Sequence, residues 1–130
     1  MRRSSGSGSK ILVTYLMLIG FIIGGYWVIQ LSGSFLFHSS GTIRNSNYII
    51  WHIIAELITS ILSIIAAYLV LIRHPLGKRL AMFTCGMLLY TGLNSIGWGS
   101  LHDPGLLTIF MFCSIGAFFG LFYLIGQDEI

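Results

Sequence analysis

Charged residues are scarce in this sequence: Asp, Glu, Lys and Arg together make up 8% of its 130 residues. Soluble domains carry about 25% charged residues, so this scarcity excludes an ordinary soluble domain. It also excludes a disordered chain, because disordered chains are polar and 55% of these residues are hydrophobic. The net charge is +3, but the basic residues gather beside long apolar segments. Their positions favour membrane lipid, and not nucleic acid, as the partner.

Cysteine and proline are also scarce, with two residues of each. Cys85 and Cys113 fall in different apolar segments, at depths that differ by about 12 Å if both segments are helices crossing a membrane. That separation is too large for a disulfide, and the sequence has no CxxC motif. Catalytic motifs are missing as well, including a nucleophile elbow, a glycine-rich phosphate loop and HExxH. We therefore expect a protein that is not an enzyme.

Four long apolar segments dominate what is present, at residues 11–31, 48–72, 80–98 and 106–125. A bilayer core of about 30 Å requires about 20 apolar residues in a helix, and each segment meets that length. Pro75 and Pro104 both lie between segments, where a missing N–H does not interrupt a helix. The sequence therefore predicts an all-α, four-helix transmembrane bundle. We expect a single domain over residues 11–126, with a flexible basic tail at 1–10 and a short acidic tail at 127–130.

The basic residues predict the orientation of this bundle in the membrane. Six of the seven Lys and Arg residues fall before the first segment or between the second and third, and only Arg44 falls elsewhere. Basic loops stay in the cytoplasm, so both termini are predicted to be cytoplasmic. The sequence thus predicts a multi-pass protein of the plasma or cytoplasmic membrane.

Pairs of small residues predict how the helices pack. Gly20 with Gly24, and Gly116 with Gly120, have the small-xxx-small spacing that lets helix backbones approach closely in lipid. The pairs favour packing within the bundle, with a homodimer face as the alternative. A bundle this small exposes much surface, so a homo-oligomer or a larger membrane complex is also expected.

Glu56 is the acidic residue that falls inside an apolar segment, roughly 12 Å from its outer end. An acidic side chain at that depth costs about 3 kcal/mol, so it requires a partner. His52 lies one turn earlier on the same face, a spacing that allows a hydrogen bond or an ion pair. The same face continues inward with hydroxyl residues, namely Thr59, Ser60 and Ser63.

The third apolar segment offers partners at matching depths. Counting inward from Trp98 places Asn94 at the level of His52 and Tyr90 at the level of Glu56. Tyr26 could add a phenol from the first segment. We therefore expect an outward-facing polar pocket whose ligand- or proton-binding residues are Glu56, His52, Tyr90, Asn94, Tyr26 and Thr59.

Three interpretations of this pocket remain open. Ionisable groups inside a membrane are usually functional, which favours a site for a small solute, a lipid-like ligand or an ion, with proton-coupled transport as an extension. The pocket could instead pin two helices together in an accessory or scaffolding subunit. The third interpretation is a metal or haem site, with His52, Glu56 and His102 as ligands. Since no ionisable group lies deeper than Glu56 to relay a proton onward, binding is favoured over conduction.

Overall fold

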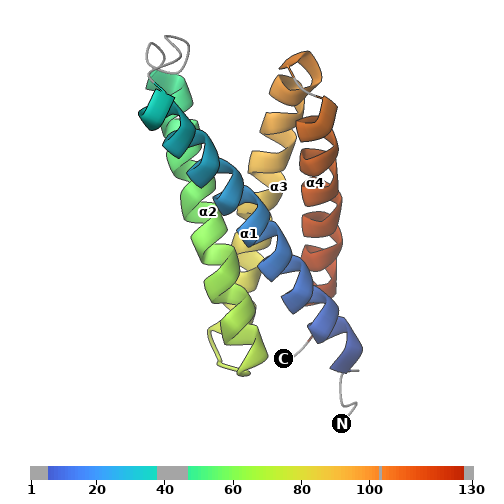
Figure 1. Ribbon diagram of the computed structural model, residues 1–130. Coiled ribbons are helices and arrows are strands. Elements are labelled where there is room, and N and C mark those ends of the chain that lie inside the picture. The colour runs from blue at the N-terminus through green and yellow to red at the C-terminus, as the bar shows by residue number, and fades with distance from the viewer. Residues whose placement is uncertain (1–5, 38–46, 103, 128–130) are drawn as a thin grey trace.

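A computed structural model of the chain describes residues 6–37, 47–102 and 104–127, with side chains described over 6–32, 50–97 and 104–127 (Figure 1). These residues form four helices: α1 (Gly6–Phe37), α2 (Asn47–Leu71), α3 (Gly77–His102) and α4 (Pro104–Ile125). The described ranges contain no strand. Each helix contains a span long and apolar enough to cross a membrane. The predicted all-α, four-helix transmembrane fold is therefore confirmed, whereas the cytoplasmic location of the termini stays a prediction.

The helices extend beyond the predicted apolar segments, most clearly in α1. This helix begins at Gly6 and ends at Phe37, whereas the apolar segment covers residues 11–31. The residues from Gly6 to Lys10, expected to be a flexible tail, are therefore helical. No proline interrupts residues 6–37, so the helical hydrogen-bond pattern can continue past the apolar segment.

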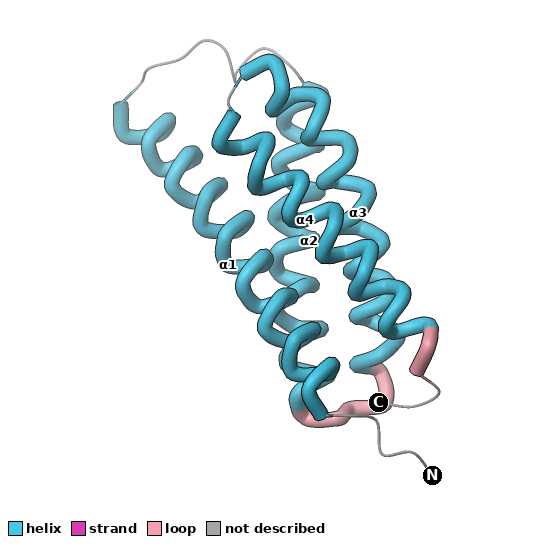
Figure 2. Tube along the Cα trace, turned by 90° about the vertical axis from the view of Figure 1, so that its right-hand side faces the viewer, coloured by secondary structure: helices cyan, strands magenta, loops and turns pink. Residues whose placement is uncertain are grey.

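The four helices form two antiparallel hairpins, α1–α2 and α3–α4, joined by close packing of α2 against α3 (Figures 1 and 2). Both described chain ends lie at the same end of the bundle, which we call the near end. The opposite end, where α1 and α3 finish and α2 and α4 begin, is the far end. In Figure 1, α1 crosses α2 obliquely and moves away from α4 toward the far end.

The contacts between α1 and α4 show where these two helices touch. The Tyr15 hydroxyl donates to the carbonyl of Cys113 at 2.6 Å, and the Tyr15 ring lies against Gly116. Nearer the termini, Leu12 packs at Gly120. Cys85 and Cys113 are both free and buried in this part of the core.

Glycines also allow the close approach of α1 to α2. The hydroxyl of Ser60 donates to the carbonyl of Gly20 at 2.7 Å. A Cβ added at Gly20 would lie 3.0 Å from the Ser60 carbonyl oxygen, and one at Gly24 would also meet the Ser60 side chain. Both small-xxx-small pairs thus pack within the bundle, while a homo-oligomer stays a prediction.

A tight turn connects α2 to α3 at the near end. Arg73 has a φ of 56°, and its N–H donates to the Val70 carbonyl at 3.1 Å while that of His74 donates to Leu69 at 2.9 Å. These are the two hydrogen bonds of a Schellman motif, which ends a helix by satisfying its last carbonyls.

Candidate functional site

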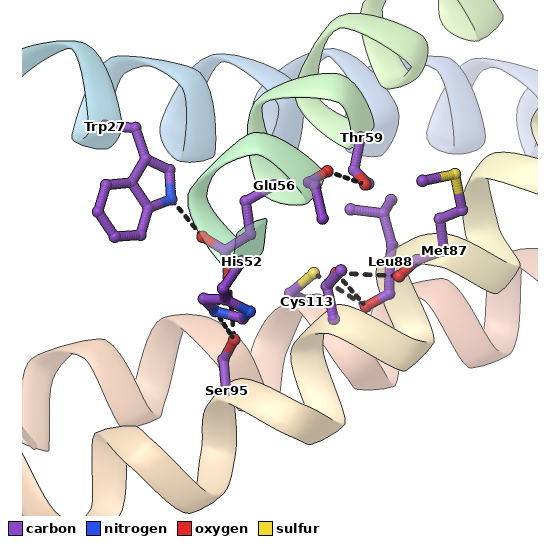
Figure 3. Close-up of polar contacts among 10 residues, drawn as sticks. Trp27, His52, Glu56, Thr59, Met87, Leu88, Ser95 and Cys113 are labelled. Carbon is purple, nitrogen blue, oxygen red and sulfur yellow. Dashed lines mark hydrogen bonds and ion pairs between the residues drawn. The ribbon is translucent and has the colours of Figure 1, made fainter. Parts of the chain in front are cut away.

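Glu56 lies inside the bundle with 2% of its surface exposed, and donors from three helices surround its carboxylate (Figure 3). The Ser95 hydroxyl on α3 donates to Oε1 at 2.9 Å. His52, on α2, places Nε2 3.0 Å from the same oxygen. On α1, the Trp27 indole N–H donates to Oε2. Both carboxylate oxygens are therefore occupied by groups of the protein.

His52 links the buried carboxylate to the surface of the bundle. The helical spacing of four residues places its ring one turn from Glu56, toward the far end. Its Nε2 is also 3.1 Å from the Ser95 hydroxyl, so the three side chains form a closed triangle of contacts. The His52 side chain is 23% exposed, against 2% for Glu56. The imidazole therefore reaches the surface of the bundle, whereas the Glu56 carboxylate lies beneath it.

The chemistry of the donors indicates what this cluster can hold. An indole N–H can only donate, and an ionised carboxylate can only accept. Trp27, Ser95 and the imidazole N–H of His52 together supply donors to both oxygens, an arrangement that suits a carboxylate. The same cluster can also accept a proton, because imidazole and carboxylate are both bases.

Trp27 and Ser95 were not among the residues predicted to bind. Trp27 lies near the end of an apolar segment, where an interfacial aromatic residue is the usual interpretation. The signal that could have identified it is its N–H, which requires an acceptor when an indole leaves the surface. Ser95 is adjacent to the predicted Asn94 and carries a hydroxyl at the same depth.

The predicted partners on α3 lie elsewhere in the structure. Tyr90 is 73% exposed, and Asn94 is exposed as well, so neither is gathered around Glu56. Thr59 is fully buried one turn below Glu56, but its hydroxyl donates to the Ala55 carbonyl of its own helix at 2.7 Å. Of the six predicted binding residues, the structure brings together Glu56 and His52, with Tyr26 beside them.

Tyr26 lies in the wall of a small cavity that reaches Glu56. The cavity has a volume of about 20 Å³, close to the space of one water molecule. Its other lining residues come from α1 and α4 and are apolar: Ile22, Ile23, Leu106, Ile109 and Phe110. The Tyr26 ring also packs edge-on against Trp27, with ring centroids 5.2 Å apart. A wider depression of about 470 Å³ runs along α1 from Val13 to Ile22, and no ionisable group lines it.

Several hydroxyl groups below Glu56 bond to backbone carbonyls, whereas the buried Thr84 hydroxyl has no hydrogen-bond partner in the described part of the chain. The hydroxyl of Ser63 donates to the Thr59 carbonyl at 2.8 Å, and that of Thr91 donates to Met87 at 2.9 Å. Such bonds satisfy a hydroxyl locally and do not link one side chain to the next. Among the described residues, no chain of side-chain hydrogen bonds therefore runs from Glu56 to the near end.

The metal and haem interpretations depend on residues outside this cluster. Within the described residues, no group of three or more His, Cys, Asp or Glu side chains could hold a metal ion. The predicted third ligand, His102, has its side chain outside the described part of the structure. A metal or haem role for His52 thus stays a prediction.

Comparison with protein families places the chain in a known group. A family model described as a domain of unknown function (DUF8058) matches residues 7–129. The chain belongs to this family. No curated protein and no solved structure matches the chain. The DUF8058 match covers the four helices except for Gly6, and so includes the whole Glu56 cluster.

Proposed function

We propose that the protein is a non-enzymatic, multi-pass protein of the cytoplasmic membrane that binds a small ligand beside Glu56 and exchanges a proton at the Glu56–His52 pair. The observation that carries the proposal is a carboxylate with 2% exposure that receives donors from three helices. Burying an acidic side chain in a membrane span costs several kcal/mol, so a chain without a use for it would gain stability from an apolar residue there.

The cavity supports binding beside Glu56. The cavity adjoins Glu56 and lies between α1 and α4. The α4 residues that line it are all apolar. Ser95 and His52, the partners of Oε1, do not line the cavity. A ligand group entering the cavity would therefore approach the carboxylate without first displacing Ser95 or His52.

A second candidate function is that of an accessory subunit in a larger membrane complex, with the Glu56 cluster serving only to pin helices together. The bonds from Trp27 and Ser95 support it, because they tie α1 and α3 to α2. Under this hypothesis the cluster would keep one protonation state wherever the protein stays folded.

Infrared difference spectroscopy separates the two candidates. Protein in lipid nanodiscs is taken from neutral to acidic pH, and the carboxyl C=O stretch is recorded for wild type and for Glu56→Gln. We expect a band that appears on acidification in wild type and is missing in the variant. Ser95→Ala should move the frequency of that band, because it removes a hydrogen bond to Oε1.

The remaining carboxyl groups are the same in wild type and in Glu56→Gln, so their contributions cancel in the comparison. If wild type and Glu56→Gln give the same difference spectrum while both remain helical, Glu56 takes up no proton and the accessory-subunit hypothesis is favoured.

A further inference from the structure

The chemical class of the ligand can be inferred from the walls of the cavity beside Glu56, an inference that rests on the function proposed above. We propose that the cleft between the far halves of α1 and α4 takes a lipophilic ammonium ion, a primary amine on an alkyl chain, from the surrounding bilayer. The ammonium group would pair with the Glu56 carboxylate, and the alkyl chain would lie between the two helices.

The first argument is the composition of the cleft. Glu56 is the ionisable acid among its lining residues, and the remaining walls are aliphatic or aromatic. A polar solute would lose its hydration against these walls without replacing it, which disfavours binding. A molecule with one cationic group and an apolar remainder matches both parts of the lining.

The second argument is size. The cavity of about 20 Å³ holds about one water molecule, and an ammonium group has a similar size. The charged head therefore fits the existing space, whereas the alkyl chain does not. The chain must extend between the helices toward the lipid, which fits an amphiphile and excludes a compact organic cation.

The third argument is the way α1 and α4 are joined. Their contacts lie toward the near end, where Tyr15 meets the Cys113 carbonyl and Gly116, and where Leu12 packs at Gly120. Beyond Tyr15, α1 follows α2 and diverges from α4 toward the far end (Figures 1 and 2). The far halves can therefore separate for an alkyl chain while the near-end contacts hold.

The fourth argument is charge. When the His52 imidazole is neutral, the three donors to Glu56 are all uncharged, so they leave its negative charge without a counter-ion. Ammonium would supply that counter-ion, with the Tyr26 and Phe110 rings in the same cavity wall able to favour a cation.

Acid should weaken amine binding, because a proton competes for the same negative charge. The titratable side chains that surround Glu56 in the described residues are His52 on α2, Tyr26 on α1 and, deeper in the bundle, Cys113 on α4. Among the described side chains of α3, Ser95 is the one that donates to the carboxylate. A proton taken up by the Glu56–His52 pair would neutralise the negative charge that the ammonium group requires.

The test uses octylamine as the probe and octanol as an uncharged molecule of the same chain length. Binding to the full chain in nanodiscs is followed by the fluorescence of Trp27, with Trp51 and Trp98 replaced by Phe. We expect octylamine to give a saturable change, octanol to give none, and Glu56→Gln to weaken octylamine binding by about tenfold or more. Saturable binding of octanol with equal affinity would overturn the proposal, because charge would then play no part.

A second variant keeps the test valid if Glu56→Gln fails to fold. Ile109→Trp places a large ring in the cleft wall and should abolish octylamine binding while leaving the infrared band of Glu56 in place. Binding to the tryptophan variants is measured with radiolabelled octylamine, because the added indole would fluoresce together with Trp27. Ile115→Trp is the matched control, because Ile115 is an exposed α4 residue outside the cavity lining, and it should bind octylamine normally. Unchanged binding in Ile109→Trp would reject the cleft as the site.

The two proposals fail in different ways. An infrared band without octylamine binding would overturn the amine inference and leave proton exchange standing. If the band is missing in wild type, the proposed proton exchange fails, whereas saturable binding of octylamine that is lost in Glu56→Gln would still support a ligand beside Glu56.

Discussion

Trp27 makes a hydrogen bond whose loss should be measurable on its own. Trp27→Phe keeps an aromatic ring and removes the N–H that donates to Glu56 Oε2. Hydrogen bonds to charged groups contribute about 1.5–3 kcal/mol, so we expect the free energy of unfolding in detergent to fall by about that amount. The measurement is loss of helical circular dichroism on titration with SDS. Trp51→Phe is the control, because Trp51 is 70% exposed. Equal effects of the two substitutions would show that the indole bond adds no stability.

Ser95 and Asn94 provide a second comparison between neighbouring residues. Ser95→Ala removes the hydroxyl that contacts both Glu56 and His52, and leaves their buried polar atoms short of a partner. We expect a loss of about 1–3 kcal/mol in the free energy of unfolding, whereas Asn94→Ala should change it by less than about 0.5 kcal/mol. A larger effect at Asn94 than at Ser95 would contradict the arrangement around the carboxylate.

These two residues show which part of the site the sequence can predict. The depth of Glu56, its pairing with His52 and the level of its partners on α3 all follow from the rise along a helix. Rotation about the helix axis does not. Asn94 and Ser95 differ by about 1.5 Å in depth but by about 100° in direction. Polar residues occur on several sides of α3, so no single polar face indicated which one points toward α2.

At the scale of the helices, the contact between α1 and α2 can be tested at two nearby glycines. A Cβ at Gly20 would lie 2.9 Å from Ile64 Cγ1 and 3.0 Å from the Ser60 carbonyl oxygen, whereas one at Gly25 would meet no atom within 4 Å. We expect Gly20→Ala to lower the free energy of unfolding by about 1–3 kcal/mol. Gly25→Ala should leave it unchanged or raise it by up to about 1 kcal/mol, since alanine favours a helix. SDS titration of both variants decides the matter, and equal stabilities would argue against tight α1–α2 packing there.

The number and order of the helices could be predicted because lipid leaves few alternatives to a helix for an apolar segment. Their ends could not, since backbone groups beyond the lipid can bond to water or continue the helix equally well. The crossing of α1 over α2 was also beyond the sequence. It depends on the close contact of Gly20 with Ser60, and that crossing is what carries Trp27 to Glu56.

For the whole molecule, the distribution of basic residues predicts the side on which each end lies. Arg73, Lys78 and Arg79 at the near end should keep that end in the cytoplasm. A membrane-impermeant maleimide applied to intact cells should label Gly105→Cys at the far end and spare His74→Cys until the cells are lysed. The native thiols give little background, because Cys85 and Cys113 are buried. Labelling of His74→Cys in intact cells would reverse the predicted orientation.

The origin of the donors to Glu56 bears on how the chain is synthesised. Two of them, Trp27 and His52, belong to the α1–α2 hairpin, and only Ser95 comes from the second hairpin. A nascent chain that has released α1 and α2 from the ribosome already contains partners for both oxygens of its buried acid. The first hairpin can therefore leave the insertion machinery for the lipid before α3 enters the membrane. Because Trp27 and His52 precede α3 in the chain, the Glu56 carboxylate has hydrogen-bond partners before α3 enters the lipid.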